Sequence, residues 1–361
     1  MKKLSITLLL CVSMLMPLTG CNAEADTAIR KADDLFDSAL EFTGLPVFEN
    51  NNLVSSLNNK ECCYQPFCYD SERIYFTNAK DGQYLYSYDG ESLECLVEMP
   101  VHSLNYHDNC IFFLSDKELK NFYNGASAEG YLYRYDLSEN KAEKLSDFII
   151  RELHVNDKGI FYIDADENNK FTAYQFDEST GKGTPKYHSL SVHDLNGYHI
   201  CFKPGEEKLE FYLTNNEETY KLPVKDIPRY DCIVNGKYYY RPQFEHSLIA
   251  VDLAEGKSEE IPIPNDMYMD DYTVFDGTVY MILDSTLFKL CGGELKKLEY
   301  IDDKLSFSVL NNFAYISHIF SGSNAMYTLV EFSDESDENV YDFAEIILND
   351  DGETYYIKSI T

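Results

Sequence analysis

Residues 155–177, VNDKGIFYIDADENNKFTAYQFD, contain the repeating unit on which the fold prediction rests. A polar turn at residues 156–159 leads into the apolar run 160–164. A second run, residues 173–177, alternates apolar and polar side chains and ends in an Asp, as a half-buried strand entering a turn does. The unit therefore predicts successive antiparallel strands joined by tight turns.

Both runs recur along the chain, the first at a mean spacing of roughly 40 residues. Its copies begin at Ile74, Ile111, Ile160, Ile200, Tyr238, Val279 and Phe313. The second run returns at residues 85–90, 132–136 and 249–252, and a more polar run follows it, as at residues 141–145. With the short run that precedes each unit, this gives about four strands per repeat and about seven repeats.

Four short antiparallel strands cannot bury both of their faces, whereas packing such units around an axis buries them. We therefore predict an all-β chain folded as a β-propeller of about seven four-stranded blades, with six or eight as alternatives. The count is open because residues 326–332 and 343–360 can be divided into strands in two ways. A β-sandwich with coincidental spacing is the competing fold.

The two runs resemble the YWTD-type propellers named after the low-density-lipoprotein receptor-related proteins, in particular a branch of unassigned function found in bacterial lipoproteins. Residues 161–164, Phe-Tyr-Ile-Asp, come nearest to the tetrad, while the other units lack its Asp and all lack its Trp. The resemblance covers roughly residues 64–361 and implies a propeller. The animal family has six blades, which also leaves the count open.

Residues 1–20 are predicted to be an export signal. Two lysines precede residues 4–16, which are almost entirely apolar and are too short for a membrane span of about 20 residues. Leu18-Thr19-Gly20-Cys21 resembles the bacterial lipobox, which implies a lipid with palmitate-type acyl chains on the thiol of Cys21. An ordinary signal peptide with a chance Cys is the alternative. We expect a protein anchored by lipid to the cell membrane on its extracytoplasmic side.

Residues 21–60 are predicted to link this anchor to the propeller, which occupies residues 61–361. Apolar residues at three- and four-residue spacings predict an amphipathic helix over residues 26–42, followed by Asn-rich sequence.

The composition excludes some partners and leaves the cysteines undecided. The formal charge of −32 disfavours nucleic acid, and 30 Tyr and 22 Phe favour strands. The clustered Cys62, Cys63 and Cys68 lack an obvious fourth ligand for zinc. A disulfide from this cluster to Cys95 or Cys110 is an open alternative.

No catalytic motif is complete in this sequence. Residues 125–129 lack the last Gly of a nucleophile elbow, and a chain without Trp has neither the sialidase repeat nor the Trp of quinone-dependent propellers. The calcium-like residues 164–168 are followed by Asn169 in place of Gly and Gln175 in place of Glu. We therefore predict no cofactor, no metal and no catalytic residues.

Binding is the function that remains. On the predicted register, two loops share one face of the ring, namely residues 116–130 with Phe122 and Tyr123, and residues 265–270 with Met267, Tyr268 and Met269. Exposed aromatic and Met side chains on loops can anchor a partner. We expect a binding or assembly module for a protein or glycan. The alternatives are an enzyme that uses axial carboxylates on an extracellular polymer, and a solute-binding role beside a transporter.

Overall fold

The structure is a computed structural model in which every element of the described residues is a strand. The described residues are 40–41, 66–115, 129–156, 159–165, 171–188, 194–195, 198–204, 209–214, 219–224, 228–234, 237–242, 246–264, 266–301, 315–322, 324–333 and 339–361. In this part of the chain no helix is long and apolar enough to cross a membrane.

The strands form consecutive four-stranded antiparallel meanders, and the first three lie in the N-terminal half of the described chain. The first is β2 (Phe67–Tyr69), β3 (Ile74–Asn78), β4 (Tyr84–Tyr88) and β5 (Leu93–Val97). The second is β6 (His102–His107), β7 (Cys110–Ser115), β8 (Glu129–Asp136) and β9 (Lys141–Lys144). The third is β10 (Ile150–Asn156), β11 (Gly159–Ala165), β12 (Phe171–Asp177) and β13 (Lys182–His188).

The remaining meanders follow the same order. They are β14 (Asp194–Leu195), β15 (Tyr198–Pro204), β16 (Leu209–Thr214) and β17 (Thr219–Lys221), then β18 (Pro228–Val234), β19 (Lys237–Pro242), β20 (Ser247–Asp252) and β21 (Ser258–Pro262). Next come β22 (Met269–Phe275), β23 (Thr278–Leu283), β24 (Thr286–Cys291) and β25 (Glu294–Lys297), and lastly β27 (Tyr315–Ser321), β28 (Met326–Ser333), β29 (Asn339–Leu348) and β30 (Thr354–Ser359).

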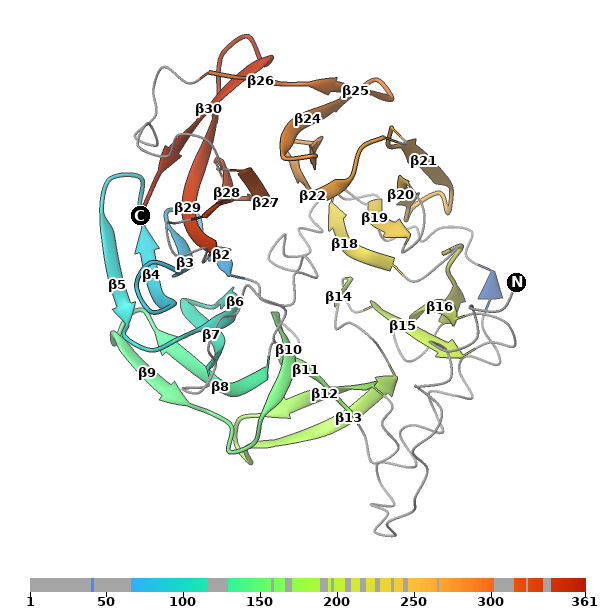
Figure 1. Cartoon of the computed structure of the whole chain (residues 1–361). Helices are drawn as coiled ribbons and strands as arrows, with labels where there is room; N and C mark the ends of the chain where they lie inside the picture. Colours follow the sequence, from blue (N-terminus) through green and yellow to red (C-terminus); the bar gives the residue numbers. More distant parts are fainter. Residues whose placement is uncertain are drawn as a thin grey trace, which may run out of the picture.

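These meanders are arranged around a common centre, with the first strand of each nearest to it (Figure 1). The second and third meanders share one eight-stranded sheet, because Ile150 and Arg151 of β10 pair with Gly130 and Glu129 of β8. The predicted apolar runs are confirmed as the second strands β3, β7, β11, β15, β19 and β23. The run expected to begin at Phe313 differs: its described part is β27, a first strand, and β28 is the second.

Two short parallel strands cover outer edges of the ring. β1 (Leu40–Glu41) pairs with β17, and β26 (Glu299–Tyr300) pairs with β30. Uncovered edges expose unpaired N–H and C=O groups, so such pairing satisfies them. The predicted helix over residues 26–42 is therefore wrong at its end, where Leu40 and Glu41 are strand; its other residues lie outside the described chain.

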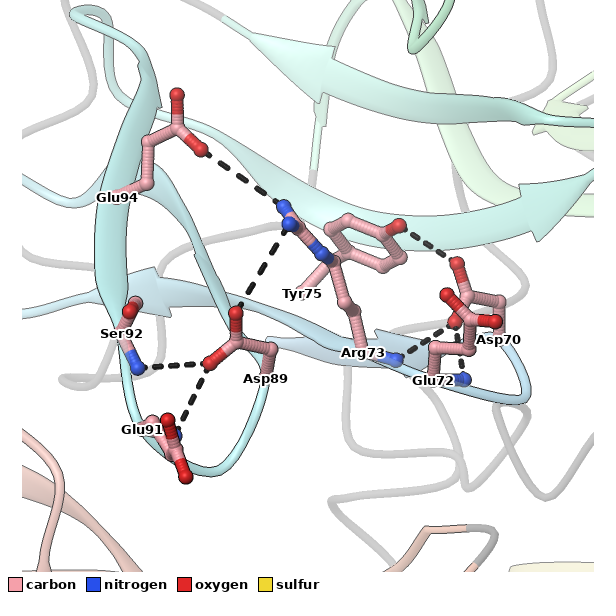
Figure 2. Close-up of polar contacts among 8 residues, drawn as sticks. All are labelled: Asp70, Glu72, Arg73, Tyr75, Asp89, Glu91, Ser92 and Glu94. Atoms are coloured by element: carbon pink, nitrogen blue, oxygen red, sulfur yellow. Dashed lines mark hydrogen bonds and ion pairs between the residues drawn. The ribbon is translucent and has the colours of Figure 1, made fainter.

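The Asp that ends the second run caps the turn between the third and fourth strands. Asp89 accepts hydrogen bonds from the backbone N–H groups of Ser92 (2.7 Å) and Glu91 (3.0 Å) (Figure 2). These two bonds, in that order, lower the pKa of its carboxyl. Such Asx turns explain why the second run ends in Asp. Hydrogen bonds of this kind are also accepted by Asp136, Asp177, Asp252 and Asp351.

The core lies between neighbouring meanders, and one part of it joins the two ends of the chain. Phe67 and Phe76 of the first meander pack against Phe320, Tyr327 and Phe343 of the last. The closest pair, Phe76 and Phe343, stacks with ring centroids 4.4 Å apart. We call this aromatic contact the closing seam.

The ion pair between Lys80 Nζ and the buried carboxylate of Asp342, at 2.8 Å, also crosses the closing seam. Lys358 of β30 reaches across it as well, donating to the hydroxyl of Tyr88 at 2.9 Å.

The first strands of several meanders carry a β-bulge near their beginning. Register shifts occur in β6, β10, β18, β22 and β27. A bulge turns the side chains that follow it, so polar residues enter the packing between first strands. Asn105 of β6, for example, donates to the carbonyl of Leu153 (3.1 Å) and accepts from the N–H of Val155 (3.3 Å).

The described cysteines whose state is known are free thiols: Cys68, Cys95, Cys110 and Cys291. The disulfide from the cluster to Cys95 or Cys110 is therefore not formed in this structure. Cys62 and Cys63 lie outside the described residues.

Candidate functional site

The candidate site begins at the link between β21 and β22, which is held to the tight turn between β23 and β24. Asp284 and Ser285 of that turn both have positive φ (45° and 58°), as a two-residue hairpin turn of this type requires. The N–H of Asp284 donates to the Tyr268 carbonyl at 2.9 Å, and Asp284 Oδ1 accepts from the Tyr268 N–H at 3.0 Å. Asp270 Oδ2 accepts from the Ser285 N–H at 2.8 Å. The link therefore has a fixed backbone.

This fixed backbone presents Tyr268 to solvent. Tyr268 is 54% exposed, the highest value among the exposed large hydrophobic residues of the described chain. The guanidinium of Arg241, at the end of β19, lies over the ring with its carbon 4.9 Å from the centroid. Arg241 Nη1 also donates to the Met269 carbonyl at 2.8 Å, which fixes the guanidinium. Tyr268 and Arg241 thus form a pre-organised pair.

A cluster of polar side chains, Asp271 and His318, connects β22 to β27 near this pair. The carboxylate of Asp271 is fully buried and accepts from the N–H groups of Tyr272 (2.7 Å) and Ile319 (3.0 Å). His318 Nδ1 is buried 3.6 Å from Asp271 Oδ2, while the side chain as a whole is 30% exposed. Burial raises the pKa of the neighbouring Asp270 carboxyl, and the charges of Asp284 and Asp271 add to the rise.

Comparison with known proteins identifies the fold of the ring that carries this site. No protein family model matches the chain, and no curated protein matches it. The solved structures that match as β-propeller domains include Pyrococcus horikoshii acylaminoacyl peptidase (13% identity, TM-score 0.53, 82% of this chain) and a prolyl endopeptidase (12% identity, TM-score 0.51, 94% of this chain). The fold is a β-propeller. This chain spans 52% and 55% of the length of those two chains, so the likeness concerns the propeller alone.

The meanders are thus propeller blades, and the predicted binding residues separate into three groups on them. Tyr268 is exposed, and Met267 is half-buried and packs against the core between the blades. Met269 is 1% exposed and is a core residue, so its side chain is not part of the exposed surface. The reason is that β22 begins at Met269, where the bulge starts.

The other predicted residues cannot be placed, because Phe122, Tyr123 and Cys21 lie outside the described residues. Most of the calcium-like stretch does too, although Asp164 and Ala165 end strand β11. Among the residues that the structure does describe, no group of His, Cys, Asp and Glu could hold a metal ion.

Sequence reasoning missed Arg241, Asp271 and His318. Arg241 meets Met269 across 28 positions of sequence, and Asp271 meets Ile319 across 48. Only the packing of neighbouring blades creates these contacts. A chain with 62 acidic residues gives no local signal that would single out Asp271.

The arrangement can bind a ligand through one flat aromatic ring, a guanidinium and several carboxylate oxygens. These groups lie on a side of the propeller where links between blades and turns between second and third strands meet. Loops on a rigid scaffold commonly carry binding residues.

Proposed function

We propose that this protein is a lipid-anchored, extracytoplasmic β-propeller of seven blades that binds a protein or glycan partner through the surface around Tyr268. The seven meanders, β2–β5 through β27–β30, support this blade number. The eight-stranded sheet counts as two blades, since β8 and β10 pair at only two positions. The resemblance to YWTD-type propellers is further supported by residues 161–164, the stretch nearest to the YWTD tetrad, which lie on β11, the second strand of a blade.

The anchor is proposed from the lipobox alone. Replacing Cys21 by Ala should release the protein from the membrane fraction to the medium, or leave its signal uncleaved. Unchanged fractionation and unchanged processing would refute lipidation.

The observation that carries the binding proposal is the exposed, locked state of Tyr268. Most large apolar side chains of the described propeller are buried, yet two backbone hydrogen bonds and the Arg241 stack hold this ring in solvent. Since binding costs free energy for each side chain that it immobilises, a ring already held in place loses less. Tyr and Arg are also enriched where protein interfaces are strongest.

A photo-crosslinking residue at position 268, in the full chain with its lipobox intact, tests the proposal in native membranes. We expect adducts at position 268. The same residue at position 300 is the matched control, because Tyr300 is 42% exposed and belongs to β26 on another blade. Equal adducts at both positions, or none at 268, would contradict the proposal. Digestion of the adduct by a protease or a glycosidase tells protein from glycan.

One observation favours the enzyme alternative. Asp270 combines a raised pKa with the nearby His318 and Asp271, and carboxyls of this kind can act as general acids. If the protein cleaves an extracellular polysaccharide, Asp270→Asn should abolish turnover, and Asp266→Asn, at an exposed residue of the same link, should not. Absence of turnover in the wild type removes this alternative.

A further inference from the structure

We propose that Arg241 binds a carboxylate of the ligand, and that the ligand is a polypeptide presenting an acidic side chain. This inference rests on the proposed binding function and names the ligand class for the same surface.

Arg241 differs from the other arginines whose side chains the structure describes. Each of the others has a carboxylate partner: Arg73 pairs with Asp89 and Glu94, Arg134 with Glu143 and Glu178, and Arg151 with Glu129. Arg241 contacts only the Met269 carbonyl and the Tyr268 ring within the described chain. In a protein with a formal charge of −32, a guanidinium without a carboxylate is the unusual case.

The free part of this guanidinium is already oriented. A guanidinium has five N–H donors in a rigid fork, and the bond to Met269 is made by Nη1. The Tyr268 ring fixes its plane from one side. The remaining donors match the two oxygens of a carboxylate, and little side-chain freedom is left to lose on binding.

The charge of the surroundings selects among anions. Asp266, Asp270 and Asp284 lie on the same link and turn, and they repel a dianionic phosphate more than a singly charged carboxylate. A polymer of uronic acids would bring a row of charges toward the acidic protein. A single acidic side chain brings only one negative charge, and salt screening limits the repulsion between this charge and the protein's carboxylates to those within about 8 Å.

The apolar part of the surface favours a polypeptide. Tyr268 has one ring face under Arg241, which leaves the other face and its edge to a ligand. Tyr268 and Arg241 are residue types that are enriched in protein interfaces.

The test selects peptides from a random displayed library on the purified full chain in detergent. We expect the selected peptides to contain Asp or Glu, and their affinity to fall with rising salt. Arg241→Gln should weaken the best peptide about 10-fold to 100-fold, the effect of losing a charged hydrogen-bonded pair. The affinity of Arg241→Lys should lie between those of the wild type and Arg241→Gln, because an ammonium keeps the charge but cannot bind both oxygens of a carboxylate as a guanidinium does. Arg134→Gln is the matched control and should change nothing.

Selected peptides without acidic residues, or an affinity unchanged in Arg241→Gln, would overturn the inference. So would binding of an oligouronate by a protein that selects no peptide, since the ligand would then be a glycan. In either case, adducts at position 268 would still support the proposed binding function. Failure of the inference can therefore be told apart from failure of the proposed function.

Discussion

Replacing Phe343 by Ala tests the closing seam, where the two ends of the chain meet. Phe343 is 2% exposed and stacks on Phe76 at 4.4 Å and near Phe67 at 5.7 Å, both from the first blade. A buried Phe→Ala change costs about 3–5 kcal/mol, and each aromatic pair adds about 0.5–1.5 kcal/mol to simple burial. We expect a loss at the upper end of the first range, about 4–5 kcal/mol, which lowers the melting temperature by about 8–10 °C at roughly 2 °C per kcal/mol.

Phe113→Ala is the matched control. Phe113 is fully buried between the first two blades, which residues 98–101 join directly. Its loss of stability should be similar, but only Phe343→Ala should speed hydrogen exchange in the first and last blades together. A cost under about 1 kcal/mol, or an increase in exchange spread evenly over the ring, would refute the view that this seam closes the propeller.

Three further predictions use polar groups of the described core. Burial lowers the pKa of His102 to about 3, so the unfolded chain takes up its proton first as the pH falls. The contribution of neutral His102 to the free energy of unfolding should therefore be fully present above pH 6.5 and be lost between pH 6.5 and 3, by about 2–3 kcal/mol at pH 4.5. Urea unfolding of the wild type should show this loss, and His102→Gln should show a smaller one. Asp271→Ala should cost about 1–3 kcal/mol more than Asp271→Asn, because only Asn keeps an acceptor for the Ile319 N–H; equal melting temperatures would show that this bond contributes nothing. A thiol reagent should label exposed Cys95 in the native protein and buried Cys68 only after unfolding, as peptide mass spectrometry would show; early labelling of Cys68 would contradict its burial.

The repeating strands could be predicted from the sequence because each repeat carries local signals. Alternation in the run that became β4, and the Asp that follows it, depend only on neighbours within one hairpin. Such signals survive without knowledge of the rest of the fold. The same is true of the tight turn at Asp276-Gly277, where both residues have positive φ.

The bulges and the contacts between blades could not be predicted in this way. Met269 is the clearest case, since the bulge in β22 puts its side chain into the core although the sequence places it in a polar link. Arg241 is the second case, because its partners lie on the next blade. The candidate site is built from exactly these long-range contacts, so only Tyr268 and Met267 of its surroundings were found from the sequence.

The pairing of β1 with β17 sets the length of the tether. β1 lies at the rim of the ring (Figure 1). With Cys21 in the membrane, as proposed, about 19 residues separate the bilayer from this fastening point, and they can span at most roughly 65 Å. Without the two-residue pairing, residue 66 is the next described point of the chain, and the upper bound on that reach rises by roughly 90 Å. A partner held in the same membrane would then meet the binding surface at a lower effective concentration, although no residue of that surface had changed.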